Sequence, residues 1–246
     1  MIVLLFGPPG CGKGTQAAAI AQRFHIPAIS TGEMFRAECK AGTDLGRRAC
    51  SILKSGGLVG DEIVDQIVAA RIRQPDCASG FLLDGYPRTL EQAAFLDGAV
   101  RNQGLPKPIA ILLDVPAQVL VSRITARRQC GRCGRIYNMF SQPPRIGELC
   151  DDDEAPLLRR EDDTEEVILA RLQAYDDATG PMIAYYCDGG CHRVDASGDP
   201  AGIAREIERL LAAGGAPDLT ASTMLGVIAG SPQHGPRYSR LRARRP

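Results

Sequence analysis

Residues 2–15 read IVLLFGPPGCGKGT, a short apolar run followed by a glycine-rich loop and the beginning of a helical pattern. Glycines allow backbone N–H groups to turn toward phosphate oxygens, and the N-terminus of the next helix adds the positive end of its dipole. Lys13 would then reach the β- and γ-phosphates of a nucleotide. The order strand, loop, helix favours a phosphate-binding loop over a chance lysine in a glycine-rich turn.

The loop departs from the general phosphate-loop pattern at one position. That pattern has Ser or Thr directly after the lysine, whereas this chain has Gly14 there and Thr15 one residue later. The sequence therefore leaves open whether a hydroxyl contacts Mg²⁺ directly.

A second run, FLLDGYPRTLEQ at residues 81–92, has the form of a buried strand that ends in a charged turn. Ligands of open α/β sheets bind at the carboxyl ends of the strands. Asp84 is placed to hold Mg²⁺ through water, and Arg88 offers a planar fork to a phosphate. Alone, this run could be an ordinary turn, but its place after a phosphate loop favours a binding site.

Further apolar runs alternate with longer helical patterns along the chain. The runs are continuous rather than alternating, which is typical of strands buried on both faces of a parallel sheet. The pattern predicts an α/β fold with a doubly wound parallel sheet. The predicted strands are Ile2–Phe6, Pro27–Ile29, Phe81–Asp84, Ile109–Asp114 and His192–Asp195, and the predicted helices are Lys13–Phe24, Asp61–Arg73, Leu90–Arg101, Pro116–Gln129, Thr164–Tyr186 and Pro200–Ala212.

Two segments interrupt the alternation and are predicted to be insertions on a core made of residues 1–29, 60–126 and 164–213. Residues 30–59 contain two short helical patterns. Residues 127–163 are rich in Cys, Arg, Pro and Asp. From residue 214 to 246, Gly, Ala, Pro, Ser and Arg dominate and periodicity fades, which predicts a disordered tail.

Composition narrows the classes of function. Lys plus Arg and Asp plus Glu both number 29, so the zero net charge gives no electrostatic case for nucleic acid or membrane as a partner. No apolar run is long enough to span a membrane, and the N-terminal run reads as a strand rather than a signal peptide. We therefore expect a cytoplasmic protein. Its nine Cys then predict reduced thiols or a metal site rather than a disulfide framework, and Cys187, Cys191 and His192 are expected to be ordinary residues.

Metal-ligand spacing occurs inside the insertion at 127–163. Cys130-x2-Cys133 and Cys150-x2-Asp153 form two pairs separated by 16 residues. Three thiolates and a carboxylate can complete a closed tetrahedral Zn²⁺ site, which would be structural because no open position remains. Free thiols or a redox disulfide are the alternatives, and spacing alone does not decide between Asp153 and its neighbours Asp151 and Asp152.

Several motifs together resemble the adenylate kinase family over residues 1–213. They are GPPGCGKGTQ at 7–16, IPAISTGEMFR at 26–36, FLLDGYPR at 81–88, RITARR at 123–128 and RREDDTEEVILARL at 159–172. The resemblance implies a P-loop kinase core, an AMP-binding flap at 30–59 and a lid over ATP at 127–163. In some bacterial members the lid carries zinc, including a form with three Cys and one Asp.

The resemblance also implies roles for single residues. Those at the ATP site are Gly10, Cys11, Gly12, Lys13, Gly14, Thr15, Arg123, Arg127, Ile136, Tyr137 and, near a carbonyl that contacts adenine, Gly198. Those at the AMP site are Thr31, Arg36, Gly57, Leu58, Val59, Gly85, Tyr86, Pro87, Arg88, Gln92, Arg160 and Arg171. The residues expected to act in catalysis are Lys13, Arg36, Asp84, Arg88, Arg127, Arg160 and Arg171.

The implied reaction is ATP + AMP ⇌ 2 ADP with Mg²⁺, carried out by a monomer. Phosphoryl transfer requires that charge on the phosphates is neutralised and that the two nucleotides lie in line. A lysine, a magnesium ion and a group of arginines would suffice. One alternative is a UMP/CMP kinase, against which Thr31 and Gln92 argue by resemblance. The other is a catalytically silent nucleotide-binding protein, against which the complete set of cationic residues argues.

Overall fold

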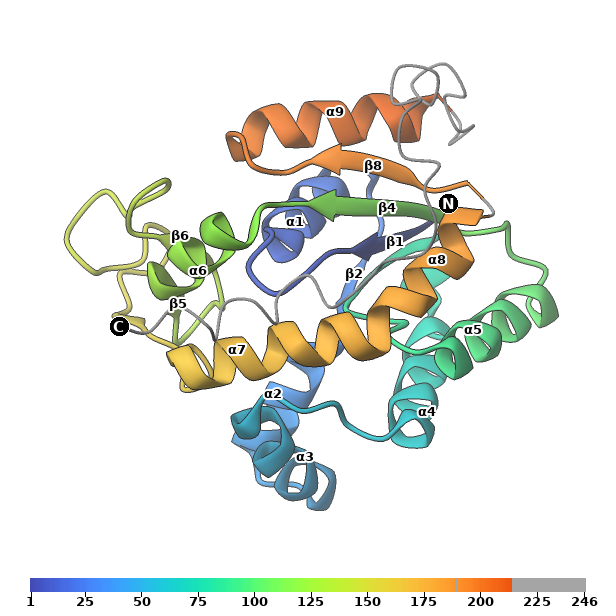
Figure 1. The fold of residues 1–246 in the computed structure, drawn as a ribbon, viewed down its shortest axis with the longest axis horizontal. Coiled ribbons are helices and arrows are strands. Elements are labelled where there is room, and N and C mark those ends of the chain that lie inside the picture. Colours follow the sequence, from blue (N-terminus) through green and yellow to red (C-terminus); the bar gives the residue numbers. More distant parts are fainter. Residues whose placement is uncertain (189, 214–246) are drawn as a thin grey trace.

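The computed structural model describes residues 1–188 and 190–213, whose centre is a parallel sheet with helices on both faces (Figure 1). The predicted doubly wound α/β fold is confirmed. The predicted tail at 214–246 lies outside the described residues. In order across the sheet, the strands are β2 (Ala28–Ser30), β3 (Phe81–Asp84), β1 (Ile2–Phe6), β4 (Ile109–Asp114) and β8 (His192–Asp195).

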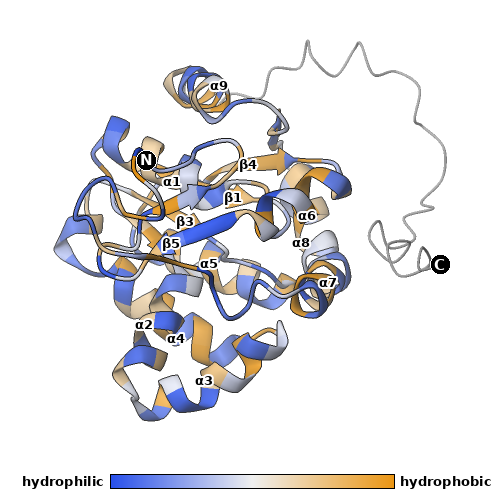
Figure 2. Cartoon of the chain, turned by 90° about the vertical axis from the view of Figure 1, so that its left-hand side faces the viewer, coloured by the Kyte–Doolittle hydropathy of each residue, from blue (hydrophilic) through white to orange (hydrophobic). Residues whose placement is uncertain are grey.

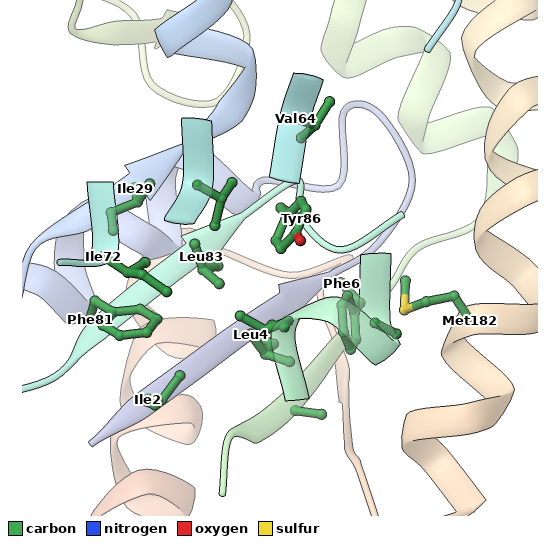
Figure 3. Packing of buried hydrophobic residues seen from close by; sticks show 14 of the residues in the cluster. Ile2, Leu4, Phe6, Ile29, Val64, Ile72, Phe81, Leu83, Tyr86 and Met182 are labelled. Atoms are coloured by element: carbon green, nitrogen blue, oxygen red, sulfur yellow. The ribbon is translucent and has the colours of Figure 1, made fainter. Parts of the chain in front are cut away.

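Strand β1 shows how the sheet organises two cores, because its successive side chains point to opposite faces. Ile2, Leu4 and Phe6 belong to one buried cluster, whereas Val3 and Leu5 belong to the other. All five residues are buried. Figure 3 shows the first cluster, in which residues of β1 and β3 face side chains from α4 and α8. This explains why the strand sequences are continuously apolar.

The helices follow most of the predicted periodic patterns. The helices are α1 (Lys13–Phe24), α2 (Thr31–Ala41), α3 (Asp44–Ser55), α4 (Asp61–Ile72), the 3₁₀ turn η1 (Pro75–Cys77), α5 (Leu90–Asn102), α6 (Ala117–Thr125), α7 (Glu165–Ala174), the π-helical turn η2 (Tyr175–Thr179), α8 (Gly180–Asp188) and α9 (Pro200–Ala212). The helix predicted at 116–129 is wrong after Thr125, because the chain there enters a strand. The helix predicted at 164–186 is divided by η2.

The insertion at 127–163 contains a small antiparallel sheet, which the sequence did not reveal. Its strands, in spatial order, are β6 (Ile136–Asn138), β5 (Arg127–Cys130) and β7 (Leu157–Leu158). Figure 2 shows β5 as a hydrophilic strand. Because β5 reads RRQC, it has no apolar run from which a strand could be predicted. The insert, at the left of Figure 1, projects beyond the carboxyl ends of the central strands.

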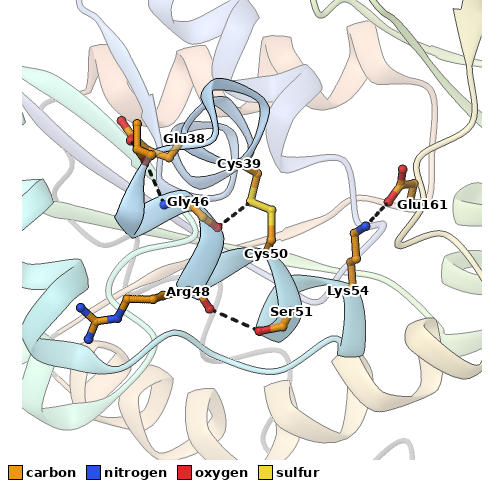
Figure 4. Close-up of a disulfide and its surroundings, with 9 residues drawn as sticks. Glu38, Cys39, Gly46, Arg48, Cys50, Ser51, Lys54 and Glu161 are labelled. Carbon is orange, nitrogen blue, oxygen red and sulfur yellow. Dashed lines mark hydrogen bonds and ion pairs between the residues drawn. A yellow bond between two sulfur atoms is a disulfide. The ribbon is translucent and has the colours of Figure 1, made fainter.

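The insertion at 30–59 is the helical hairpin α2–α3, which confirms its two predicted helical patterns. The hairpin carries a disulfide between Cys39 of α2 and Cys50 of α3, with 5.6 Å between their Cα atoms (Figure 4). A second disulfide joins Cys187 and Cys191. The prediction of reduced or ordinary thiols is therefore wrong for these four residues. Cys39 and Cys50 are eleven residues apart, and only the antiparallel packing of two helices brings them together.

Among the described residues, no helix is long and apolar enough to cross a membrane. Free thiols remain at Cys11, Cys77, Cys130, Cys133 and Cys150.

Candidate active site

The two sequence runs that predicted a ligand site meet at one edge of the sheet. Strands β1 and β3 are neighbours, and Leu5 pairs in register with Asp84. The loop after β1 leads to α1, which packs with one core cluster, while the loop after β3 leads to α5, which packs with the other. The chain thus diverges to opposite faces here, and this point of an open α/β sheet is where ligands bind. A cleft of about 1900 Å³ opens at this edge.

The glycine-rich loop after β1 lines this cleft. Gly10 has a φ of +85°, and a Cβ there would lie 2.5 Å from the Ile124 side chain of α6, so only glycine fits at this close approach. Lys13 opens α1, and its Nζ donates to the carbonyl oxygens of Gly7 at 2.7 Å and Pro8 at 3.1 Å. The loop therefore brings a cation to the N-terminus of a helix, an arrangement that binds phosphate.

The turn after β3 holds Arg88 against the floor of the cleft. The Tyr86–Pro87 peptide bond is cis. The carbonyl oxygen of Gly85 accepts hydrogen bonds from Arg88 Nε at 2.8 Å and from Thr31 Oγ1 at 3.0 Å. Burial lowers the pKa of Arg88, although the nearby Asp84 carboxylate opposes this effect. A half-buried guanidinium that lines a cleft is suited to bind an anion.

Arg36 from α2 and Arg160 from the 127–163 insert meet at one carboxylate. Glu33 Oε1 accepts from Arg36 Nη2 at 2.7 Å and from Arg160 Nη2 at 2.6 Å. Burial alone would raise the pKa of Glu33, but the two arginines outweigh it and lower this pKa. Arg36 Nε is buried and has no hydrogen-bond partner among the described residues. These contacts bring the two insertions together over the cleft.

Arg127 and Arg171 form a second cationic pair beside the first. Arg127 donates to both carboxylate oxygens of Asp163, whose side chain is fully buried. Arg171 donates to Asp162 at 2.9 Å. Burial and neighbouring arginines lower the pKa of both Arg160 and Arg171 to about 10, although adjacent carboxylates oppose the shift. The arginines therefore remain cationic at neutral pH but are held in a costly, partly desolvated setting.

Arg123 is placed differently from the other predicted cations. Its guanidinium donates to the carbonyl oxygens of Ala196 at 2.7 Å, Ser197 at 3.0 Å and Gly198 at 3.2 Å. These residues form the loop between β8 and α9, which lines the cleft beside the phosphate loop. Arg123 therefore fixes the loop that contains the predicted Gly198. Arg123 was predicted to lie at the ATP site, and these hydrogen bonds join it to backbone carbonyl groups of that loop.

A smaller cavity of about 30 Å³ lies between the α2–α3 hairpin and the turn after β3. It brings together most of the residues that the resemblance assigns to AMP. Those that line it are Thr31, Gly57, Leu58, Val59, Gly85, Arg88 and Gln92. Tyr86 stands behind this wall, because its ring is fully buried and its hydroxyl donates to Asp65 at 2.5 Å.

The insert at 127–163 reaches the phosphate loop through Ile136. A Cβ at Gly14 would lie 3.4 Å from Ile136 Cδ1, so this side chain covers the beginning of α1. Tyr137 follows Ile136 and also lines the cleft. Its ring is buried in the insert, and its hydroxyl donates to Cys150 Sγ and accepts from Asp151 N at 2.7 Å. Both predicted wall residues line the cleft, and Ile136 is the one whose side chain reaches the beginning of α1.

The four predicted metal ligands form a compact cluster at the centre of the insert. One ligand atom from each of Cys130, Cys133, Cys150 and Asp153 lies within 4.8 Å of the others. The Sγ atom of Cys130 accepts from the backbone N–H groups of Arg132 and Cys133, at 3.3 and 3.4 Å. This donor set of three sulfurs and one carboxylate fits Zn²⁺. The structure favours Asp153 over Asp151 and Asp152, which pair with Arg135 instead.

The cationic residues of the cleft were predicted from the sequence, but the acidic residues that pair with them were not. Glu33, Asp162 and Asp163 each pair with a predicted arginine. The spacing of Glu33 and Arg36 on one helical turn was the only local signal for any of these pairs. The others connect distant segments or different turns of the chain.

Comparisons with known proteins agree with this architecture. The family model for adenylate kinase matches residues 5–191. An adenylate kinase of Anaeromyxobacter dehalogenans is 44% identical over 212 residues, which cover 86% of this chain and 99% of the relative. An adenylate kinase of Thermotoga neapolitana is 48% identical over 198 residues, with 79% and 90% covered. One from Kosmotoga olearia is 44% identical over 208 residues, with 84% and 97% covered. With this degree of identity over nearly the whole of each relative, the chain belongs to the adenylate kinase family.

Proposed function

We propose that the chain catalyses reversible phosphoryl transfer from Mg·ATP to AMP, giving two ADP. The observation that carries this proposal is the convergence on one cleft of the two loops predicted to bind phosphate, together with arginines from both insertions. The cleft volume of about 1900 Å³ exceeds the ~1,000 Å³ usual for a single drug-sized ligand, so there is room for two nucleotides.

In this proposal the glycine-rich loop and Lys13 bind the phosphates of ATP, and Thr31, Arg36, Arg88 and Gln92 bind AMP. The acceptor oxygen of AMP is already anionic, so no strong general base is required. Arg127, Arg160 and Arg171 would stabilise the charge on the transferring phosphoryl group. Arg36 Nε supports this assignment, since a phosphate oxygen would provide the acceptor that this buried N–H group lacks.

Asp84 is the residue we propose to hold Mg²⁺ through water. Asp84 is the last residue of β3 and lines the cleft. It pairs in register with Leu5, which lies near the end of β1, just before the phosphate loop. An oxygen ligand at this position fits a hard divalent cation, which would neutralise charge on the ATP phosphates. Thr15 also lines the cleft, and in this proposal its hydroxyl would take the place of the one that position 14 lacks.

We propose that Cys130, Cys133, Cys150 and Asp153 hold one structural Zn²⁺. The insert buries only five residues in its own cluster, three of them Cys or Ala, so packing contributes little to its stability. Closed four-ligand coordination would replace that missing core. The residues 30–59 and 127–163 would then serve as the AMP flap and the ATP lid, and a single chain would complete the site as a monomer.

A panel of acceptors tests the proposal against its main rival. Formation of ADP from ATP is measured with AMP, UMP, CMP and GMP as acceptors. With Thr31 and Gln92 both on the wall of the smaller cavity, kcat/KM for AMP should exceed that for UMP and CMP by at least about tenfold. Equal use of UMP would contradict the assignment to AMP but leave the kinase class in place. No transfer to any acceptor would favour a silent nucleotide-binding protein.

A further inference from the structure

Gln92 lies in a closed network of hydrogen bonds at the beginning of two helices. Gln92 is 3% exposed. Gln92 Nε2 donates to Asp61 Oδ1 at 2.7 Å, and Gln92 Oε1 accepts from Arg88 N at 2.7 Å. Thr89 Oγ1 donates to the other oxygen of Asp61 at 2.6 Å. Asp61 is the first residue of α4, and Val64 of the same helix lines the small cavity.

This network permits only one orientation of the Gln92 carboxamide. If the amide were turned over, Oε1 would face the Asp61 carboxylate and Nε2 would face the Arg88 N–H group. Two hydrogen bonds, one of them to a charged group, would be replaced by two repulsive contacts. Buried hydrogen bonds to charged groups are among the stronger ones in proteins. Asp61 and the Arg88 backbone therefore fix which end of the amide donates.

The hydrogen-bonding groups of the Gln92 amide that the network does not use determine which base it can bind. An amide has two N–H donors and two lone pairs, and the network uses one of each. Gln92 therefore keeps one N–H donor and one acceptor lone pair for a ligand. It lines the small cavity together with Thr31 and Val59. Adenine presents the acceptor N1 next to the donor N6–H, which complements a fixed amide. Guanine and hypoxanthine present the donor N1–H next to the acceptor O6, which is the opposite pattern.

We propose that Asp61 is a positioning residue for purine selectivity, which acts by fixing the orientation of the Gln92 amide. The inference rests on the proposed transfer to AMP and adds the reason why 6-oxopurine nucleotides are rejected. IMP is the best probe, because it differs from AMP only at N1 and C6, whereas GMP also adds a 2-amino group. Selectivity of this kind arises because the wrong base leaves buried polar groups unpaired.

The test compares kcat/KM for AMP and IMP in the parent and in Asp61→Asn. When the Asn oxygen accepts from Thr89, its amide group faces Gln92, so Gln92 Nε2 loses its acceptor and only the Arg88 N–H group still opposes the reversed orientation. The ratio of AMP to IMP should therefore fall by at least about tenfold, through a higher KM for AMP and a lower KM for IMP. The KM for ATP should not change. Asp61→Ala removes the hydrogen bond that Gln92 Nε2 donates but leaves the one from Arg88 N, so its ratio of AMP to IMP should lie between those of the parent and Asp61→Asn. This variant provides the test if Asp61→Asn does not fold.

Asp65→Asn is the matched control. Asp65 lies one turn further along α4, and it accepts from the Tyr86 hydroxyl rather than from the Gln92 side chain. Its ratio of AMP to IMP should stay within about twofold of the parent. The inference is overturned if both Asp61 variants keep the parental ratio, or if kcat/KM falls in parallel for AMP and IMP. A parent that transfers nothing to AMP would overturn the proposed function itself and this inference with it.

Discussion

Gly46→Ala is a substitution whose effect follows from the packing of the α2–α3 hairpin. Gly46 lies in α3 where this helix crosses α2. A Cβ at this position would lie 2.0 Å from the carbonyl oxygen of Glu38, 2.3 Å from its carbonyl carbon and 2.7 Å from the backbone nitrogen of Cys39. All three atoms belong to the backbone, so no rotation of a side chain can relieve the overlap.

The size of the effect follows from these distances. Non-bonded heavy atoms prefer a separation of about 3.5 Å, so the helices would have to part by more than about 1 Å. The Cys39–Cys50 disulfide ties the two helices together and opposes this movement. Overpacking costs roughly 1–3 kcal/mol, and the better helix propensity of Ala returns about 0.5–1 kcal/mol. At about 2–4 °C per kcal/mol for a chain of this size, we expect Tm to fall by a few degrees.

Thermal unfolding and steady-state kinetics measure the result. The matched control is Gly98→Ala, the same substitution inside helix α5, where an added Cβ would meet nothing within 4 Å. Gly98→Ala should leave Tm equal or slightly higher. Gly46→Ala should also raise KM for AMP several-fold, because α2 carries Thr31 and Arg36, while KM for ATP stays the same. The reasoning is refuted if Gly46→Ala is as stable as Gly98→Ala and binds AMP normally.

Two further predictions concern the cleft and the lid. Arg88→Ala should lower kcat by at least about 100-fold, since it removes a buried electrostatic stabiliser; an unchanged kcat with a higher KM for AMP would make Arg88 a ground-state binder only. Elemental analysis should find about one zinc per chain, and both EDTA and Cys150→Ser should lower Tm more than they lower kcat. Cys77→Ser is the control, because Cys77 is a free thiol outside the cluster; a metal-free chain with full stability in EDTA would contradict the zinc site.

Local patterns in the sequence were sufficient for the central sheet but not for the insertions. The strand Ile109–Asp114 matches its predicted bounds, because burial on both faces leaves a continuous apolar run. His192–Asp195 also matches its predicted bounds, although its burial alternates along the strand. Strand β5 has no such run. Its sequence RRQC is held by antiparallel pairing with β6 and β7, so the helical pattern predicted across it was overridden by tertiary contacts.

The candidate site shows the same division between local and distant information. Lys13 and Arg88 lie shortly after the carboxyl ends of β1 and β3, so their place at this edge of the sheet could be predicted from the sequence. The hydrogen-bond partners of the site side chains could not be predicted, because Glu33 and Arg160 are 127 residues apart and Asp61 and Gln92 are 31 apart. The pairing of Cys39 with Cys50 was missed for a related reason, since nothing in the sequence gives the crossing of α2 and α3.

The acids of the cleft explain how so many arginines can share it before a phosphate binds. A buried cation is costly unless it is paired, and Arg160 is only 8% exposed. Glu33 and Asp163 supply charges of the opposite sign and hold the guanidinium groups in place. In the proposed reaction, a phosphate that enters would compete with Glu33 for Arg36 and Arg160, so part of its attraction would be offset. In return, the arginines would already be oriented when charge develops on the transferring group, and we propose that this preorganisation contributes more to the rate than the competition costs.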